Sequence, residues 1–148
     1  MNPVLPTSTT TDPAVRNPVV AVLPVGSFEQ HGPHLPLATD SLVAVAITSA
    51  ISARFEVLAL PPVTFSCSHE HASFAGTVSL SAGTLAAIIS DVAESLARSG
   101  LVGMLVVNGH GGNHVLANVV QEANVTGRLR VGLYPARQDW SEARTAAG

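Results

Sequence analysis

With 148 residues, the chain can bury one hydrophobic core but is too short for two domains of ordinary size. Hydrophobic residues make up 47% of it and charged residues 11%, a balance that argues against intrinsic disorder. A formal net charge of −3 without a basic cluster argues against nucleic acid or an anionic membrane as partner.

The single cysteine, Cys67, excludes an internal disulfide and a four-cysteine zinc site. No apolar stretch reaches the roughly 20 residues of a membrane helix without Gly or Pro, and no signal-peptide pattern is present. We therefore expect a cytoplasmic protein.

The N-terminal third predicts an arm followed by a buried strand. Residues 1–17 are rich in Thr and Pro and are expected to form a flexible or surface-draped arm, ahead of one domain over residues 18–148. The apolar run Val19–Val25, bounded by Pro18 and Gly26, predicts a buried strand.

A loop, a helix and a short strand are expected next. Gly, Pro and His mark residues 26–39 as the loop. Residues 40–55 have the length of a helix, with Thr39 or Asp40 as its N-cap. Val57–Leu60 predicts a short strand that is stopped by two prolines.

The remaining elements alternate between helix and strand. After a loop over residues 62–79, a helix is expected over Ala82–Ser99, with Ser81 as its cap and Gly100 at its end. The elements expected after it are a strand over Leu101–Val107, a turn over Gly109–Gly112, a helix over Asn113–Asn124 and a strand over Arg128–Tyr134. This alternation predicts an α/β fold with a mostly parallel central sheet covered by helices on its faces.

All six histidines lie between residues 31 and 114, in three loops near strand ends, where open α/β sheets bind ligands. In the first loop, Glu29 and His31 are two residues apart and project to the same side of extended backbone. Asp40 lies near a helix N-terminus, which favours a carboxylate. One Glu, one His and one Asp suit Zn²⁺, Mn²⁺ or Fe²⁺. The alternative is a polar loop in which Asp40 only caps the helix.

The second loop places His110 among glycines, between a buried strand and a helix. Glycine permits close approach of a ligand, and the helix N-terminus offers N–H donors to an anion or oxyanion. The alternative is a Gly-rich turn whose histidines satisfy backbone groups.

In the third loop, Glu70 and His71 could contact substrate or support metal ligands, or could belong to an exposed polar loop. The segment lacks the His-Glu-x-x-His spacing of zinc peptidases. Cys67 has no evident activator and is interpreted as a small core or loop residue.

Together these segments resemble the creatininase family, also called creatinine amidohydrolases. PVGSFEQHGPHLPLATD resembles the first family signature, VVNGHGGN the second, and HEHASFAGTVSL the segment between them. The likeness runs from Val19 to Tyr134. The family that the chain resembles includes mycofactocin-maturation peptidase-like and formylamino-pyrimidine deformylase-like members.

The resemblance implies a three-layer α/β/α fold, a hexamer or other even-numbered homo-oligomer, and a small-molecule or peptide amide as substrate. It also implies one or two divalent ions, with Zn²⁺ as first choice and Mn²⁺ or Fe²⁺ as alternatives. The metal ligands carried over by matching the signatures are Glu29, His31, Asp40 and His110, with Asp40 as the bridge. A mechanistic hypothesis follows from this ligand set: Glu70 or His71 carries the proton to the departing nitrogen, and the N–H groups near Gly111 and Gly112 hold the oxyanion.

One position departs from the pattern. Creatininase proper carries an acidic ligand where this chain has Gly112, and relatives with GHGGN take a glutamate from a later segment resembling HAGExETS, which these 148 residues do not contain. We expect the chain to be C-terminally short, with that ligand supplied from beyond Gly148, by another chain, or not at all.

Two other functions stay open. The chain could be a non-catalytic or fragmentary subunit that acts as an oligomer scaffold or small-molecule binder. It could also be a metallophosphoesterase, since Gly112-Asn113-His114 echoes a segment of that group, although the early Asp-x-His of that group is missing. No nucleotide-binding signature is present.

Overall fold

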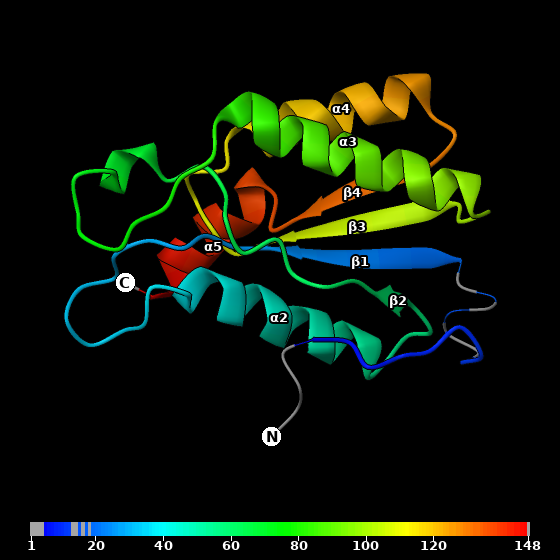
Figure 1. The fold of residues 1–148 in the computed structure, drawn as a ribbon, viewed down its shortest axis with the longest axis horizontal. Helices are drawn as coiled ribbons and strands as arrows, with labels where there is room; N and C mark the ends of the chain where they lie inside the picture. Colours follow the sequence, from blue (N-terminus) through cyan, green and yellow to red (C-terminus); the bar gives the residue numbers. More distant parts are fainter. Residues whose placement is uncertain (1–4, 13–14, 16, 18, 148) are drawn as a thin grey trace.

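The computed structural model describes residues 5–12, 15, 17 and 19–147. A four-stranded sheet forms its centre, and helices pack on both faces (Figure 1). The elements in chain order are β1 (Val20–Val25), α2 (Thr39–Ser52), β2 (Leu58–Ala59), the 3₁₀ turn η1 (His69–His71), α3 (Ala82–Arg98), β3 (Gly103–Asn108), α4 (Val115–Thr126), β4 (Arg130–Tyr134) and α5 (Arg137–Ala147).

The sheet is parallel throughout, with strand order β2-β1-β3-β4. Val20 of β1 pairs with Gly103 of β3, which in turn pairs with Arg130 of β4. Because parallel neighbours need crossover connections, the helices are carried to the faces of the sheet, and the carboxyl ends of β1 and β3 lie side by side. The predicted α/β fold with a parallel sheet is confirmed.

Helices α3 and α4 cover one face of the sheet (Figure 1). Alternate residues of the strands point to this face and form the larger hydrophobic cluster with both helices. Leu85 and Ile89 of α3 are at most 1% exposed in it. Each such side chain contributes about 1.5–3 kcal/mol relative to an exposed one.

Helix α2 covers the other face, over β1, β2 and β3 (Figure 1). The fully buried apolar residues here are Val22, Ala44 and Val107, a smaller cluster than that under α3 and α4. The buried residues of α2 also include Asp40, Ser41 and Thr48, so this helix buries polar as well as apolar groups.

The ends of α3 form as the sequence predicts. The Ser81 hydroxyl accepts a hydrogen bond from the Thr84 N–H at 3.1 Å, which is an N-cap interaction. Gly100, just beyond the helix, has φ +89°, a conformation that favours glycine after a helix end. The helix over Ala82–Arg98 is therefore confirmed together with both of its end signals.

Two features differ from the sequence predictions. Thr39 and Asp40 do not cap α2: its N-cap position is Ala38 and no side chain caps it. The Thr39 hydroxyl instead donates to the Pro36 carbonyl at 2.6 Å. The Asp40 carboxylate contacts the rings of His31 and His110. The second difference is α5, which no pattern in the sequence predicts. The other helices and strands begin and end within three residues of the expected bounds.

Within the part of the chain that the structure describes, no helix is both long and apolar enough to span a bilayer.

Candidate metal centre

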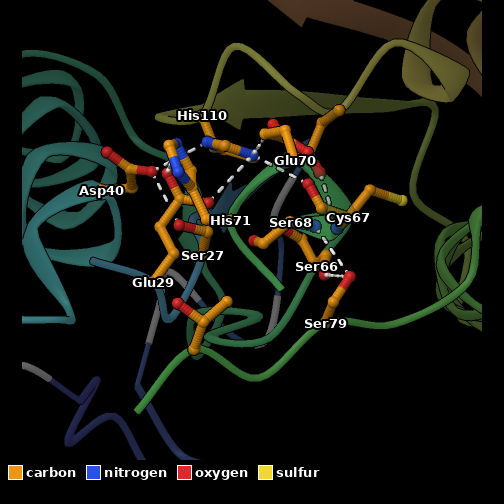
Figure 2. A network of polar contacts seen from close by, with 12 residues as sticks. Ser27, Glu29, Asp40, Ser66, Cys67, Ser68, Glu70, His71, Ser79 and His110 are labelled. Atoms are coloured by element: carbon orange, nitrogen blue, oxygen red, sulfur yellow. Dashed lines mark hydrogen bonds and ion pairs between the residues drawn. The ribbon is translucent and has the colours of Figure 1, made fainter. Parts of the chain in front are cut away.

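Four segments meet beyond the carboxyl ends of β1 and β3 (Figure 2). Glu29 and His31 come from the loop after β1, and Asp40 from the first turn of α2. His110 follows β3 directly, and η1 brings Glu70 to the same place. Residues far apart in sequence thus converge where parallel sheets place their ligands.

Asp40 lies between two histidines. Its Oδ1 is 3.0 Å from His31 Nε2, and its Oδ2 is 2.9 Å from His110 Nδ1. Oδ2 also accepts a hydrogen bond from the Ser27 hydroxyl at 2.7 Å. Burial alone would raise the pKa of Asp40. Hydrogen bonds from His110 and Ser27, together with the charges of His110 and His31, outweigh burial and hold the pKa below its ordinary value of 3.8. Asp40 is therefore a carboxylate.

The His110 ring faces an oxygen at each nitrogen. Nδ1 faces Asp40, and Nε2 lies 2.7 Å from the Cys67 carbonyl. Burial alone would lower the pKa of this ring. The hydrogen bond to Asp40, the charge of Glu29 and the bond to the Cys67 carbonyl outweigh burial and raise the pKa above its ordinary value of 6.5. A metal ion would have to displace a proton from this ring.

Glu29 supplies a buried oxygen without a donor. Its side chain is 5% exposed, and Oε2 accepts no hydrogen bond from the described residues. Oε2 lies 3.4 Å from His110 Nε2, and Oε1 lies 3.8 Å from His71 Nε2. Since buried polar groups are normally satisfied, an unsatisfied carboxylate oxygen facing histidines fits a bound cation.

Two groups of side chains have ligand atoms within 4.8 Å of one another, Glu29–His31–Asp40 and Glu29–Glu70–His110. Both contain nitrogen and oxygen donors, the set that suits Zn²⁺ and related ions. The structure thus brings together all four residues predicted as metal ligands, and their donor chemistry fits a divalent ion. Their role as ligands stays a prediction.

The other predicted site residues lie at the edge of this cluster. His71 is half-buried, and its Nδ1 lies 3.0 Å from Gln30 Nε2. Gly111 and Gly112 form the turn after β3. Burial, with the nearby charge of Glu70, raises the pKa of the Cys67 thiol, which agrees with a non-nucleophilic residue.

The remaining histidines, His34, His69 and His114, are exposed and belong to neither group.

Residues that support the cluster were not singled out from the sequence. The Asn108 Oδ1 accepts from the His110 N–H at 3.2 Å and from Asn113 Nδ2 at 3.0 Å. The Asn113 Oδ1 accepts from the Cys67 N–H at 3.1 Å, which fixes the carbonyl that His110 contacts. The Ser27 hydroxyl fixes Asp40 by donating a hydrogen bond to its Oδ2. Ser27, Asn108 and Asn113 all lie inside the two signature segments, and that position is the sequence feature that could have pointed to them.

Two glycines let α2 approach both strand ends. A Cβ on Gly26 would lie 2.4 Å from the Cα of Ser41, and one on Gly109 would lie 2.3 Å from the Asp40 carbonyl oxygen. Real side chains do not make such contacts with backbone. Glycine at these positions therefore allows the first turn of α2 to rest against the ends of β1 and β3.

The fold and the cluster define an α/β protein with carboxylate and histidine side chains gathered at the carboxyl edge of a parallel sheet. A family model described as creatininase, creatinine amidohydrolase, matches residues 7–148. The chain belongs to the creatininase family.

Similar proteins include a mycofactocin precursor peptide peptidase from Mycobacterium ulcerans (strain Agy99), 38% identical over 117 residues, which cover 72% of this chain and 46% of that protein. Among solved structures, one described as creatininase Mn matches with a TM-score of 0.70 and 26% identity over 81% of this chain and 51% of that chain. A creatininase variant of Zn-Zn type matches with a TM-score of 0.68 and 27% identity over the same shares. The chain thus spans about half the length of these relatives.

Proposed function

We propose that this chain is a metal-dependent hydrolase of amide C–N bonds, with Glu29, His31, Asp40 and His110 as its metal ligands. The observation that carries the proposal is the convergence of these four side chains around a buried carboxylate oxygen that lacks a hydrogen-bond donor. Zn²⁺ is our first choice of ion, with Mn²⁺ and Fe²⁺ as alternatives, since all three accept these ligands.

A divalent ion held here supplies Lewis acidity, which activates water as a nucleophile and polarises a substrate carbonyl. Asp40 contributes an ionised carboxylate shared between His31 and His110, the position expected of a bridging group. Ser27 holds that carboxylate in place. The protein therefore presents its ligands in fixed orientations.

The proton and the oxyanion are assigned to groups beside the cluster. His71 is oriented by Gln30 and partly open to solvent, so it can pass a proton to the departing nitrogen. The N–H groups of Gly111 and Gly112, next to His110, are proposed to stabilise the oxyanion.

A small-molecule or peptide amide is the proposed substrate class, because the family is described as creatinine amidohydrolase and one relative as a peptide peptidase. An even-numbered homo-oligomer is the proposed assembly, which light scattering of the purified chain measures directly.

The test compares the wild type with Asp40→Ala after chelation and reloading with Zn²⁺, Mn²⁺ or Fe²⁺. Hydrolysis is assayed on creatinine, on a peptide amide and on a phosphate ester. We expect metal-dependent amide hydrolysis in the wild type and none in Asp40→Ala, with Glu94→Gln, an exposed carboxylate on α3, as control.

Full activity in Asp40→Ala contradicts the proposal. Phosphate ester hydrolysis alone supports a metallophosphoesterase. A folded chain that binds no metal and hydrolyses nothing supports a scaffold or small-molecule binder.

A further inference from the structure

The Glu70 carboxylate lies in the space that a side chain on Gly112 would take. A Cβ built on Gly112 would meet Glu70 Oε1 at 2.1 Å and His110 Nε2 at 2.4 Å. The φ of Gly112 is not positive, so its backbone does not itself demand glycine. That Cβ would also lie 2.9 Å from the Cys67 carbonyl oxygen, so glycine here leaves room for the Glu70 carboxylate, the His110 ring and that carbonyl together.

Glu70 and Glu29 approach the same nitrogen of His110. Nε2 lies 3.3 Å from Glu70 Oε1 and 3.4 Å from Glu29 Oε2, the buried oxygen that accepts no hydrogen bond. In Figure 2, His110 stands between Asp40 on one side and Glu70 on the other. The second nitrogen of the ring therefore faces two carboxylates in addition to the Cys67 carbonyl at 2.7 Å.

Two carboxylates this close repel each other unless a positive charge lies between them. Glu29, Asp40 and Glu70 bring three negative charges to the cluster, and histidines that bind a metal are neutral. One ion at Glu29–His31–Asp40 leaves Glu70 uncompensated. A second divalent ion at Glu29–Glu70–His110 would neutralise it with oxygen and nitrogen donors of the right kind.

We propose that Glu70 is a metal ligand that completes a second cation site with Glu29 and His110, and that Gly112 makes room for it. The inference rests on the proposed function, because it assumes that the first group also binds a metal. It gives Glu70 a role other than proton transfer and supplies the acidic ligand from within the described chain.

The test is metal stoichiometry, which does not depend on turnover. The purified chain is stripped with a chelator, reloaded with Zn²⁺ or Mn²⁺, freed of excess ion and analysed by elemental mass spectrometry. We expect two equivalents in the wild type and one in Glu70→Gln, which keeps the side-chain volume but loses the charge. Glu94→Gln removes one exposed carboxylate elsewhere and is expected to keep two.

The paired glycines provide an independent arm. Gly112→Ala is expected to displace Glu70 and His110 Nε2, the two ligands on that side of the second group, and to lose the same equivalent, whereas Gly111→Ala, whose Cβ would meet nothing within 4 Å, is expected to keep both. Circular dichroism checks that each variant is folded. If Gly112→Ala does not fold, Glu70→Gln decides alone, because Glu70 is 46% exposed and its replacement is isosteric.

The outcomes separate the two proposals. Two equivalents in Glu70→Gln overturn the role of Glu70 as a ligand, even if turnover is lost, and indicate proton transfer instead. One equivalent in the wild type also overturns it, while leaving the proposed function intact. A wild-type chain that binds no metal at all overturns the proposed function itself.

Discussion

The sheet face under α3 and α4 and the face under α2 bury different kinds of side chain. The first holds the larger apolar cluster, including Leu85 and Ile89. The second holds a small apolar cluster and the polar residues Asp40 and Thr48. Buried apolar area stabilises a fold, whereas buried polar groups cost free energy unless they are paired. The face under α3 and α4 therefore buries most of the apolar side chains, and the face under α2 carries Asp40 to the site.

The largest effect on stability is expected from the α3 face. Leu85→Ala should lower the free energy of unfolding by about 2–5 kcal/mol, because it leaves a cavity in a fully buried position. Metal equivalents should be unchanged. Chemical denaturation and elemental analysis measure the two effects, with Ser90→Ala, an exposed position on the same helix, as control. Loss of metal in a folded Leu85→Ala variant would break the division between the faces.

A smaller loss of stability is expected where α2 meets β3. Gly109→Ala places a methyl group against the Asp40 carbonyl, and such overpacking costs about 1–3 kcal/mol. Because the clash moves the turn that carries Asp40, metal affinity should also fall, as titration calorimetry measures. Gly83→Ala on α3 is the control, since its Cβ would meet only the Ser81 hydroxyl at 4.0 Å. Unchanged affinity in a destabilised Gly109→Ala would contradict the coupling.

A third change should act on the site with little effect on the fold. Ser27→Ala removes the 2.7 Å hydrogen bond to Asp40. Loss of a group that orients a metal ligand typically lowers affinity about 10–100-fold. The free energy of unfolding should fall by only about 1 kcal/mol. The same titration and denaturation measurements apply, with the exposed Ser95→Ala as control. Equal metal affinity in wild type and Ser27→Ala would remove Ser27 from the site.

The smallest effect is the pH dependence of the chelator-treated chain. His110, with a raised pKa, contributes stability that is complete below 6.5 and is lost as pH rises through the folded value. Asp40, with a lowered pKa, contributes stability above 3.8 that is lost as pH falls through its folded value. The stability difference between wild type and His110→Asn should therefore shrink as pH rises above 6.5 and through the folded pKa of His110.

Leu85→Ala is the control for the pH dependence of His110→Asn. The difference between wild type and Leu85→Ala involves no ionisable group, so it should not vary with pH over the same range. Denaturant unfolding at several pH values in the presence of chelator measures both differences. A constant difference for His110→Asn would show that the Asp40–His110 pair does not contribute to folding.

Local signals explain which elements could be predicted. The cap at Ser81, the apolar spacing of α3 and Gly100 all lie next to the helix that they define, so its bounds follow from sequence. Helix α5 carries few apolar residues and gave no periodic signal. The N-cap of α2 was wrong because Thr39 and Asp40 are good capping residues that make other contacts in the fold.

For the site, the signatures predicted which residues would gather but not how they touch. Glu29, His31 and Asp40 lie within one segment, so their proximity could be expected. The Glu70 carboxylate lies where a Cβ on Gly112 would be, although the two residues are 42 positions apart in the sequence. This placement depends on how the loop that contains η1 packs against the turn after β3. No pattern along the sequence encodes that packing distance.

The close contact of α2 with Gly26 and Gly109 also bears on how fast the centre can acquire an ion. Backbone packing fixes the turn that carries Asp40 when the sheet and helix form, so its conformational entropy is lost during folding rather than during ion capture. For the proposed ion, capture would then require a proton to leave His110, the hydrogen bond between His31 and Asp40 to open, and water to leave the ion. We expect loading rates to follow the rate at which each ion sheds its hydration shell, and not the motions of the chain.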